Sequence, residues 1–394
     1  MAATSSHSWT ARPPREVVRP LWVLLAALAL EGCAVALAPP MVHPHTVHCA
    51  PDGNDCLTRG REDFGAYRSG KLQEIRNKNQ GYRLPSAPVA YLHPERTTYS
   101  VLLIHGLNDS SYYMADVGEV LYRNGFNVIT VLLPGHGTDT RDMLEVTAEE
   151  WRAEVELGLE IASLVGRQIL LGGFSLGGAL ALELAARRRD IQGLLLFSPA
   201  IRIRSFESVS ALSCAPGLRS IVINTDLPPN PVKYKYRVGN SVCQLHRLLE
   251  HNLDLEHPAA CGRPSLRDLA RRVHVPTFIA VSYADRRISP VAILEFAGNI
   301  PAPVLVTTFG KAEDQSVPVF ANGGKILAVS DASLPHSYLM RRTNPYNGQA
   351  NPCFDRMAAL LSGFLAQHFH SNFQRPAAGW PACGPIPGEF HSSE

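Results

Sequence analysis

Between about residues 87 and 310, short apolar runs alternate with longer stretches whose apolar residues recur at helical spacing. Continuous apolar runs are typical of parallel strands that are buried on both faces of a sheet. Recurrence every three or four residues predicts amphipathic helices. The pattern therefore predicts an α/β fold with a mostly parallel sheet. The expected strands are 89–92, 100–104, 126–133, 168–174, 191–197, 275–283 and 304–309, and the expected helices are 111–123, 148–165, 176–188, 290–297 and 357–369.

The alternation breaks between residues 200 and about 272, a stretch rich in Pro, Ser and Asn that holds three cysteines. Long insertions into compact domains usually carry function. Because this stretch also contains scattered apolar residues, we interpret it as a cap inserted between two core strands. The alternative is a surface excursion without a role in substrate binding.

The N-terminus has the pattern of a targeting segment. Three arginines precede the apolar run Leu21–Leu30, which predicts that residues 1–33 form a signal peptide or a membrane anchor. Cys33 follows a small residue, as in the lipobox of bacterial lipoproteins, although Glu31 departs from that pattern; an uncleaved anchor is the alternative. We therefore expect an exported protein of the cell envelope, either membrane-anchored through its N-terminus or periplasmic.

Residues 34–86 are expected to form a tether and an irregular approach, residues 87–370 the folded domain and residues 371–394 a Pro-rich tail.

Composition narrows the partners of the protein. The 394 residues carry a net charge of +2, and the basic and acidic residues are interspersed, so no basic surface for nucleic acid is expected. Seven cysteines follow Cys33, which is typical of an oxidising compartment. The neighbouring pairs expected to form disulfides are Cys49–Cys56, Cys243–Cys261 and Cys353–Cys383, which leaves Cys214 unpaired.

One glycine-rich stretch carries the strongest chemical signal. The expected strand 168–174 runs into Gly173-Phe-Ser-Leu-Gly177, and an expected helix follows at once. Glycines two residues before and after Ser175 permit a sharp turn, because a Cβ at either place would meet neighbouring backbone. The pattern predicts a nucleophile elbow with Ser175 at its apex. A serine that only caps the following helix is the alternative.

A serine nucleophile needs a histidine base and an acid that orients it. Asp285 follows the expected strand 275–283, and His336 lies in a loop before the last expected helix, which gives the chain order Ser, Asp, His. We therefore predict that Ser175, Asp285 and His336 are catalytic. The competing acids are Asp314 and Asp331, and the competing histidines are His368 and His370.

An oxyanion hole needs two backbone N–H groups that point at the developing negative charge. The first is expected from Leu176, the residue after the nucleophile. The second is expected from Leu107, in the loop that follows the strand 100–104 and begins with His105-Gly106.

These motifs, together with Pro134-Gly-His-Gly137, resemble those of the α/β-hydrolase superfamily. Within it, the chain is most similar to the branch of monoacylglycerol lipases, carboxylesterases and lysophospholipases, and the run at residues 133–138 is the most branch-specific piece. The resemblance covers residues 87–370. It implies an eight-stranded, mostly parallel sheet flanked by helices, a cap between strands six and seven, a Ser-Asp-His triad and no cofactor. No metal site is expected either, because no second group of ligands completes the cluster of His43, His45, His48 and Cys49. It also implies a structural role for His136.

The sequence thus predicts a serine hydrolase that cleaves carboxylic esters, of a lipid or another acyl group, through an acyl-enzyme on Ser175. Transfer of the acyl group to another acceptor, or cleavage of a thioester or amide, would use the same triad. A catalytically inactive binding protein at the cell surface is the alternative from a different class.

Overall fold

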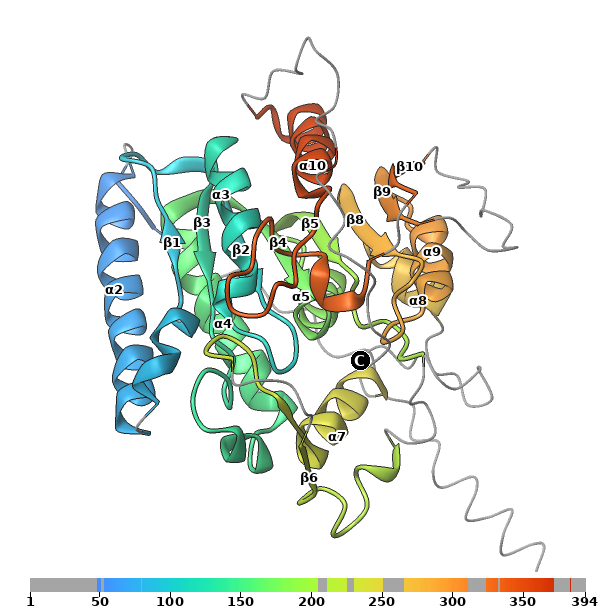
Figure 1. Ribbon diagram of the computed structural model, residues 1–394. Helices are drawn as coiled ribbons and strands as arrows, with labels where there is room; N and C mark the ends of the chain where they lie inside the picture. Colours follow the sequence, from blue (N-terminus) through green and yellow to red (C-terminus); the bar gives the residue numbers. More distant parts are fainter. Residues whose placement is uncertain are drawn as a thin grey trace, which may run out of the picture.

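The computed structural model describes residues 48–50, 53–78, 80–204, 211–224, 230–250, 266–310, 324–331, 334–371 and 383. Within these ranges, one eight-stranded sheet crosses the molecule and helices pack on both sides of it (Figure 1). Its spatial order is β1-β3-β2-β4-β5-β8-β9-β10, and every neighbouring pair except β1 with β3 is parallel. The mostly parallel eight-stranded sheet is therefore confirmed. The strands are β1 (Ala90–Tyr91), β2 (Thr97–Ile104), β3 (Asn127–Thr130), β4 (Gly166–Phe174), β5 (Ile191–Phe197), β8 (Thr277–Ser282), β9 (Val304–Phe309) and β10 (Lys325–Ser330).

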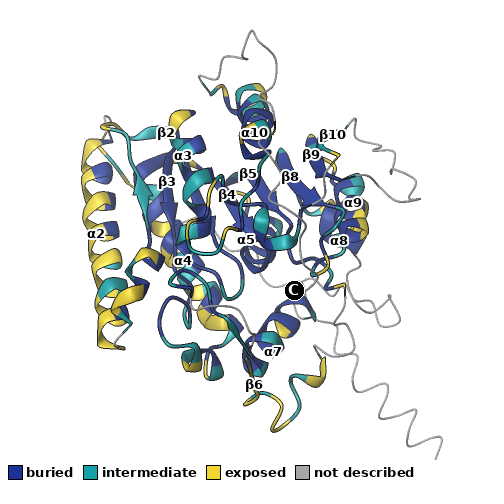
Figure 2. Cartoon of the chain, in the orientation of Figure 1, coloured by how far each residue is buried: buried dark blue, intermediate teal, exposed yellow. Residues whose placement is uncertain are grey.

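Each central strand sends alternate side chains into two separate cores. In β2, Leu102 and Ile104 join one core while Val101 and Leu103 join the other. The strands are apolar on both faces because helices cover both faces (Figure 2). Helices α4 (Ala148–Val165), α5 (Leu176–Arg187), α8 (Leu266–Arg271) and α9 (Pro290–Asn299) line the first core, and α3 (Ala115–Arg123) and α10 (Phe354–Phe369) line the second.

The expected irregular approach at residues 34–86 is wrong for its described part. Residues Asn54–Asn77 form helix α2, which packs along α4 at one side of the molecule (Figure 1). The apolar pattern does not predict this helix, because most of its residues are polar and only five of them are buried. Polar contacts complete its attachment, since Tyr67 and Lys71 both bind the carboxylate of Glu154 in α4.

The cap lies beyond one end of the sheet, where β6 (Val222–Asn224) and β7 (Tyr236–Val238) form an antiparallel pair beside α7 (Gly239–Leu248) (Figure 1). By chain order this insertion follows the fifth strand of the described sheet and not the sixth, because only the short β1 precedes β2. The count of eight is completed at the opposite edge by β10.

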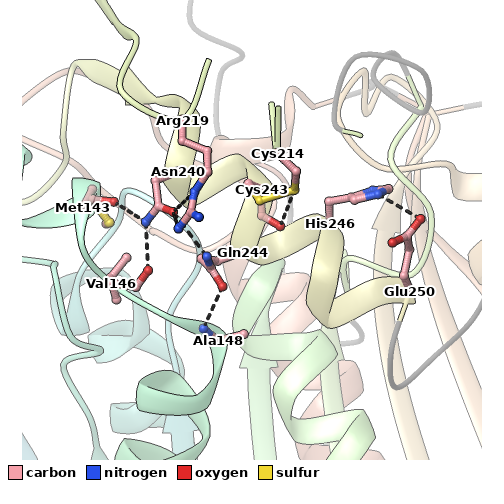
Figure 3. The surroundings of a disulfide bond; sticks show 10 residues. All are labelled: Met143, Val146, Ala148, Cys214, Arg219, Asn240, Cys243, Gln244, His246 and Glu250. Carbon is pink, nitrogen blue, oxygen red and sulfur yellow. Dashed lines mark hydrogen bonds and ion pairs between the residues drawn. A yellow bond between two sulfur atoms is a disulfide. The ribbon is translucent and has the colours of Figure 1, made fainter. Parts of the chain in front are cut away.

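Polar contacts fix the cap to the domain, and a disulfide closes the cap on itself. Asn240 donates from Nδ2 to two carbonyl oxygens of the domain: that of Met143 in η3 (Thr140–Leu144), at 2.9 Å, and that of Val146, between η3 and α4, at 2.8 Å. Figure 3 shows these contacts beside the disulfide between Cys214 and Cys243.

Two of the expected disulfides, Cys49–Cys56 and Cys353–Cys383, are confirmed. The expected partner of Cys243 is wrong, since it bonds to Cys214 and not to Cys261. The β6–β7 pairing brings the turn at residues 211–219 against α7, and Gly239 donates its N–H to the carbonyl of Ile221. The prediction of Cys261 as the partner used only its short distance from Cys243 along the chain, which does not show how the chain folds back.

Several sequence predictions lie outside the described residues: the N-terminal segment 1–33 with Cys33, most of the tail 371–394, Cys261 and Asp314. Among the helices that the structure describes, none has the length and apolarity needed to cross a bilayer.

Candidate active site

Ser175 stands at a sharp turn between β4 and α5. Its backbone has φ 52° and ψ −115°, a conformation that costs a non-glycine residue about 1–3 kcal/mol and is concentrated at functional sites. A Cβ on Gly173 would lie 2.2 Å from the carbonyl oxygen of Gly177, so the turn closes only with glycine there. The local geometry is that of the predicted nucleophile elbow.

Asp285 and His336 meet although 51 residues separate them. Asp285 follows β8 and is completely buried, while His336 begins the short helix η5 (His336–Tyr338). Nδ1 of His336 lies 2.6 Å from Oδ2 of Asp285, a length typical of a hydrogen bond between an imidazole and a carboxylate. This contact fixes the ring so that Nε2 is left to act elsewhere.

The surroundings of Asp285 favour its ionised form. Burial by itself raises the pKa of this carboxyl group, but the contact with His336 and the N–H groups of Ile288 and Arg287 outweigh it and hold the pKa below its usual value. Both N–H groups donate to Oδ1, at 2.9 and 2.8 Å. Asp285 therefore presents Oδ2 to His336 as a fixed, negatively charged acceptor.

Phe174 brings the histidine to the elbow. Its ring lies against that of His336, with centroids 4.8 Å apart, and it directly precedes Ser175. In this structure the hydroxyl of Ser175 and the ring of His336 form no hydrogen bond. Catalytic hydrogen bonds are often long in free enzymes and shorten when substrate binds.

The two expected oxyanion donors come from neighbouring backbones. A Cβ on Gly177 would lie 2.1 Å from the carbonyl oxygen of Ile104, so the first turn of α5 touches the end of β2. Leu176 begins α5, where backbone N–H groups have no acceptor within the helix. Leu107 lies in the loop that follows β2. The fold thus places both segments side by side at the elbow.

Two buried histidines hold the loop that carries Leu107. Nε2 of His105 accepts the N–H of Leu133 at 3.1 Å, and Nε2 of His136 accepts the N–H of Asn108 at the same distance. Burial lowers the pKa of His105 to about 4 and that of His136 well below its usual value, so both rings are neutral at pH 7. His136 therefore has a structural role. The supporting role of His105 was missed from the sequence, although its place in the His-Gly pair was a signal.

The competing residues lie elsewhere. Asp331 is exposed after β10, His368 packs its ring against Phe364 within α10, and His370 is exposed after that helix. None of the three shares the contacts of Asp285 and His336.

Comparison with known proteins agrees with this architecture. The model of the alpha/beta hydrolase family matches residues 101–387, well over half of the chain. The chain belongs to the alpha/beta hydrolase family. The match contains the elbow, Asp285 and His336 as well as the cap.

The individual relatives with matching sequence cover only part of this chain. A thermostable monoacylglycerol lipase of Bacillus sp. (strain H-257) is 33% identical over 111 residues, which are 28% of this chain and 44% of the lipase. Phospholipase YtpA of Bacillus subtilis (strain 168) is 27% identical over 113 residues, again 28% and 44% of the two chains. The chain thus matches less than half of the length of these curated relatives. A soluble variant of monoglyceride lipase from Saccharomyces cerevisiae shares the fold, with a TM-score of 0.52 and 15% identity over 73% of this chain and 92% of that one.

Proposed function

We propose that this hydrolase cleaves carboxylic esters through an acyl-enzyme on Ser175. The observation that carries the proposal is the 2.6 Å contact between His336 and the buried Asp285, next to a serine held in a strained turn. A serine hydroxyl is a poor nucleophile by itself and becomes a strong one when a fixed imidazole accepts its proton.

The reaction follows from these positions. Oγ of Ser175 attacks the acyl carbon while its proton moves to Nε2 of His336, and the N–H groups of Leu107 and Leu176 bind the resulting oxyanion. The alkoxide leaves with the proton from His336, which produces an alcohol and the acyl-enzyme. Water then gives a proton to His336, attacks the acyl carbon and releases the carboxylic acid with a free Ser175.

Lipid esters are the substrate class we favour. The relatives with matching sequence include a monoacylglycerol lipase and a phospholipase. In addition, the cap exposes a group of large apolar side chains, which suits contact with acyl chains. These residues are Leu212, Leu218, Ile221, Val222 and Ile223.

We also propose that the protein is exported and held at the cell envelope by its N-terminal segment. The three disulfides among the described residues support an oxidising compartment. Cell fractionation with intact-mass analysis tests this, and recovery of the whole chain with reduced thiols from the cytosol would contradict it.

The central experiment compares the parent protein with Ser175→Ala. We expect the parent to react with a fluorophosphonate probe and to hydrolyse p-nitrophenyl esters and monoacylglycerols. Ser175→Ala should not react with the probe and should hydrolyse esters at least about a thousandfold more slowly. Ser163→Ala, a change on α4 away from the elbow, is the matched control. Equal ester hydrolysis by the Ser175→Ala and parent proteins would refute the proposed mechanism.

A further inference from the structure

Three chain segments meet next to His336. The loop after β2 carries Asn108 and Ser110, which bind the cap: Tyr234 donates its N–H to the carbonyl of Asn108, and Ser110 donates its hydroxyl to the carbonyl of Val232, both at 2.8 Å. Between these two contacts, the cap residue Lys233 extends toward η5. The cap therefore contacts residues 105–110, which we call the oxyanion loop because they include Leu107, through backbone as well as side-chain atoms.

Lys233 links the oxyanion loop to η5, the short helix that begins with His336. Its Nζ donates to Oγ of Ser337, the residue after His336, at 2.5 Å. The same Nζ lies 3.6 Å from Oδ1 of Asp109 and 5.7 Å from the centre of the Tyr113 ring. One cation thus contacts both segments that are expected to act on the substrate.

The ion pair between Lys233 and Asp109 is largely withdrawn from solvent. The side chain of Lys233 is 17% exposed and that of Asp109 is 4% exposed. Oδ1 of Asp109 has no hydrogen bond in the structure, and the ammonium group of Lys233 contributes most of the positive charge that compensates it. Breaking a buried ion pair on one side leaves an uncompensated charge and is strongly unfavourable.

Asp109 also lies close enough to His336 for the charges of the two side chains to interact. Burial raises the pKa of Asp109 above its usual value, and the positive charges of Lys233, His336 and Arg287 oppose that rise only in part, with Lys233 opposing it most. The charged and titratable groups around this cluster are Asp285 and Arg287 after β8, Asp109 after β2, Tyr113 in η2 (Ser111–Met114) and Lys233 in the cap.

We propose that Lys233 is a positioning residue for His336: it holds the turn through Ser337 and neutralises the second carboxylate, Asp109, so that Asp285 alone orients the imidazole. The proposal rests on the proposed catalytic role of His336. It assigns the cap segment 230–234 a part in building the active site.

The test follows the pH dependence of fluorophosphonate labelling in the full chain. In Lys233→Met, the Asp109 carboxylate keeps its place but loses its cation, which favours the protonated form of His336. Ser175 needs a neutral imidazole, so the labelling rate falls at low pH, and we call this part of the profile the acid limb. In Lys233→Met the acid limb should move to higher pH by about one unit, and at a given pH on that limb labelling should be about tenfold slower than in the parent.

Three further variants separate this effect from a general loss of structure. Lys233→Arg should restore the parental profile, since it keeps the cation. The double variant Asp109→Asn/Lys233→Met should also move the limb back, since it removes the buried charge. Lys235→Met, two residues along the same cap segment, should keep the parental profile.

The outcomes distinguish the two proposals. A parent that reacts with the probe and a Lys233→Met protein with an unchanged profile would overturn the role of Lys233 alone. A shifted limb that the double variant fails to move back would also overturn it, because the effect would then not pass through Asp109. A folded parent that does not react would overturn the proposed function and this inference with it. If Lys233→Met does not fold, Lys233→Gln takes its place, since it also removes the cation and keeps Asp109, and the same shift is expected.

Discussion

Ser175 lies at the carboxyl ends of the central strands β4, β5 and β8, which we call the sheet edge from here on. The sheet edge and the cap that lies beyond it are stabilised by different kinds of interaction. At the edge, β4, β5 and β8 are joined by continuous parallel pairing, and almost all of their side chains are buried. The cap has one short pair of strands, and several of its large apolar side chains are exposed (Figure 2).

Individual polar contacts take the place of a continuous core in the cap. Besides the bonds of Asn240 to the carbonyls before α4, Arg219 donates to Oδ1 of Asn240 at 2.7 Å, and Gln244 accepts the N–H of Ala148 at 3.2 Å (Figure 3). On the other side of the cap, Tyr234 donates to the carbonyl of Gly135 at 2.9 Å. Each contact is specific, and few of them can be replaced by a neighbour.

This difference indicates how each region should respond to change. A small steric error at the sheet edge is transmitted through rigid backbone to the elbow and the oxyanion loop together. An error in the cap outside segment 230–234 should lower stability and change how substrate is held while the sheet stays intact. Substitutions in the two regions should therefore differ in kind as well as in size.

The largest effect is expected at Gly177. In Gly177→Ala the new Cβ would lie 2.1 Å from the carbonyl oxygen of Ile104 and 2.6 Å from that of His105, so α5 and the oxyanion loop must separate. We expect kcat/KM to fall at least about a hundredfold, as when an oxyanion donor is lost, and the free energy of unfolding to fall by about 2–4 kcal/mol.

Ester hydrolysis and chemical unfolding measure this effect, with Gly65→Ala as the matched control. Gly65 is exposed in the middle of α2 with no atom near its missing Cβ. That variant should keep full activity and gain about 0.5–1 kcal/mol, because alanine favours a helix more than glycine does. Parental activity in Gly177→Ala would show that the close approach is not required.

The same difference explains which parts of the fold could be predicted from the sequence. The bounds predicted for α4, β5 and β9 agree with the structure, because burial on one or both faces imposes a regular apolar pattern. Asp285 and His336 could be paired because topology brings the carboxyl ends of strands to one edge. These signals come from repetition and chain order.

The features that could not be predicted depend on single contacts between distant residues. Helix α2 is attached by Tyr67 and Lys71 through Glu154, a pattern with no apolar period. The partner of Cys243 depends on how the β6–β7 pair folds back, and chain separation does not encode that. No sequence motif surrounds Lys233. Its proposed role depends on its contacts with Asp109 and Ser337, which only the folded structure reveals.

A smaller effect on activity is expected when the cap loses its disulfide. Cys214 and Cys243 are 29 residues apart, and opening a loop of that size costs about 3–4 kcal/mol in a chain-entropy estimate. In Cys214→Ala/Cys243→Ala we expect that loss in unfolding free energy, with a larger change in KM than in kcat because the sheet edge is untouched.

Chemical unfolding and ester kinetics test the cap disulfide, and Cys49→Ala/Cys56→Ala is the control. That pair closes a loop of separation 7, so its removal should cost about 1 kcal/mol less in the same estimate and leave KM unchanged. A fall in kcat as large as that of Gly177→Ala would mean that the cap and the sheet edge are not separable in the way proposed.

The smallest effect concerns His105, which supports the oxyanion loop from inside the core. Its pKa in the folded protein is about 4, against about 6.5 for an unfolded histidine, so between these values the unfolded chain binds a proton that the folded one does not. Stability should therefore fall as pH falls from 7 to 4.5, with His105 accounting for about 2–3 kcal/mol.

In His105→Gln, an amide oxygen can still accept the N–H of Leu133 without titrating, so the difference in unfolding free energy between the two pH values should shrink by that amount. Unfolding measurements at both pH values, with the exposed His274→Gln as control, decide the matter. An equal difference in His105→Gln and the parent would show that this ring is not a source of the acid sensitivity.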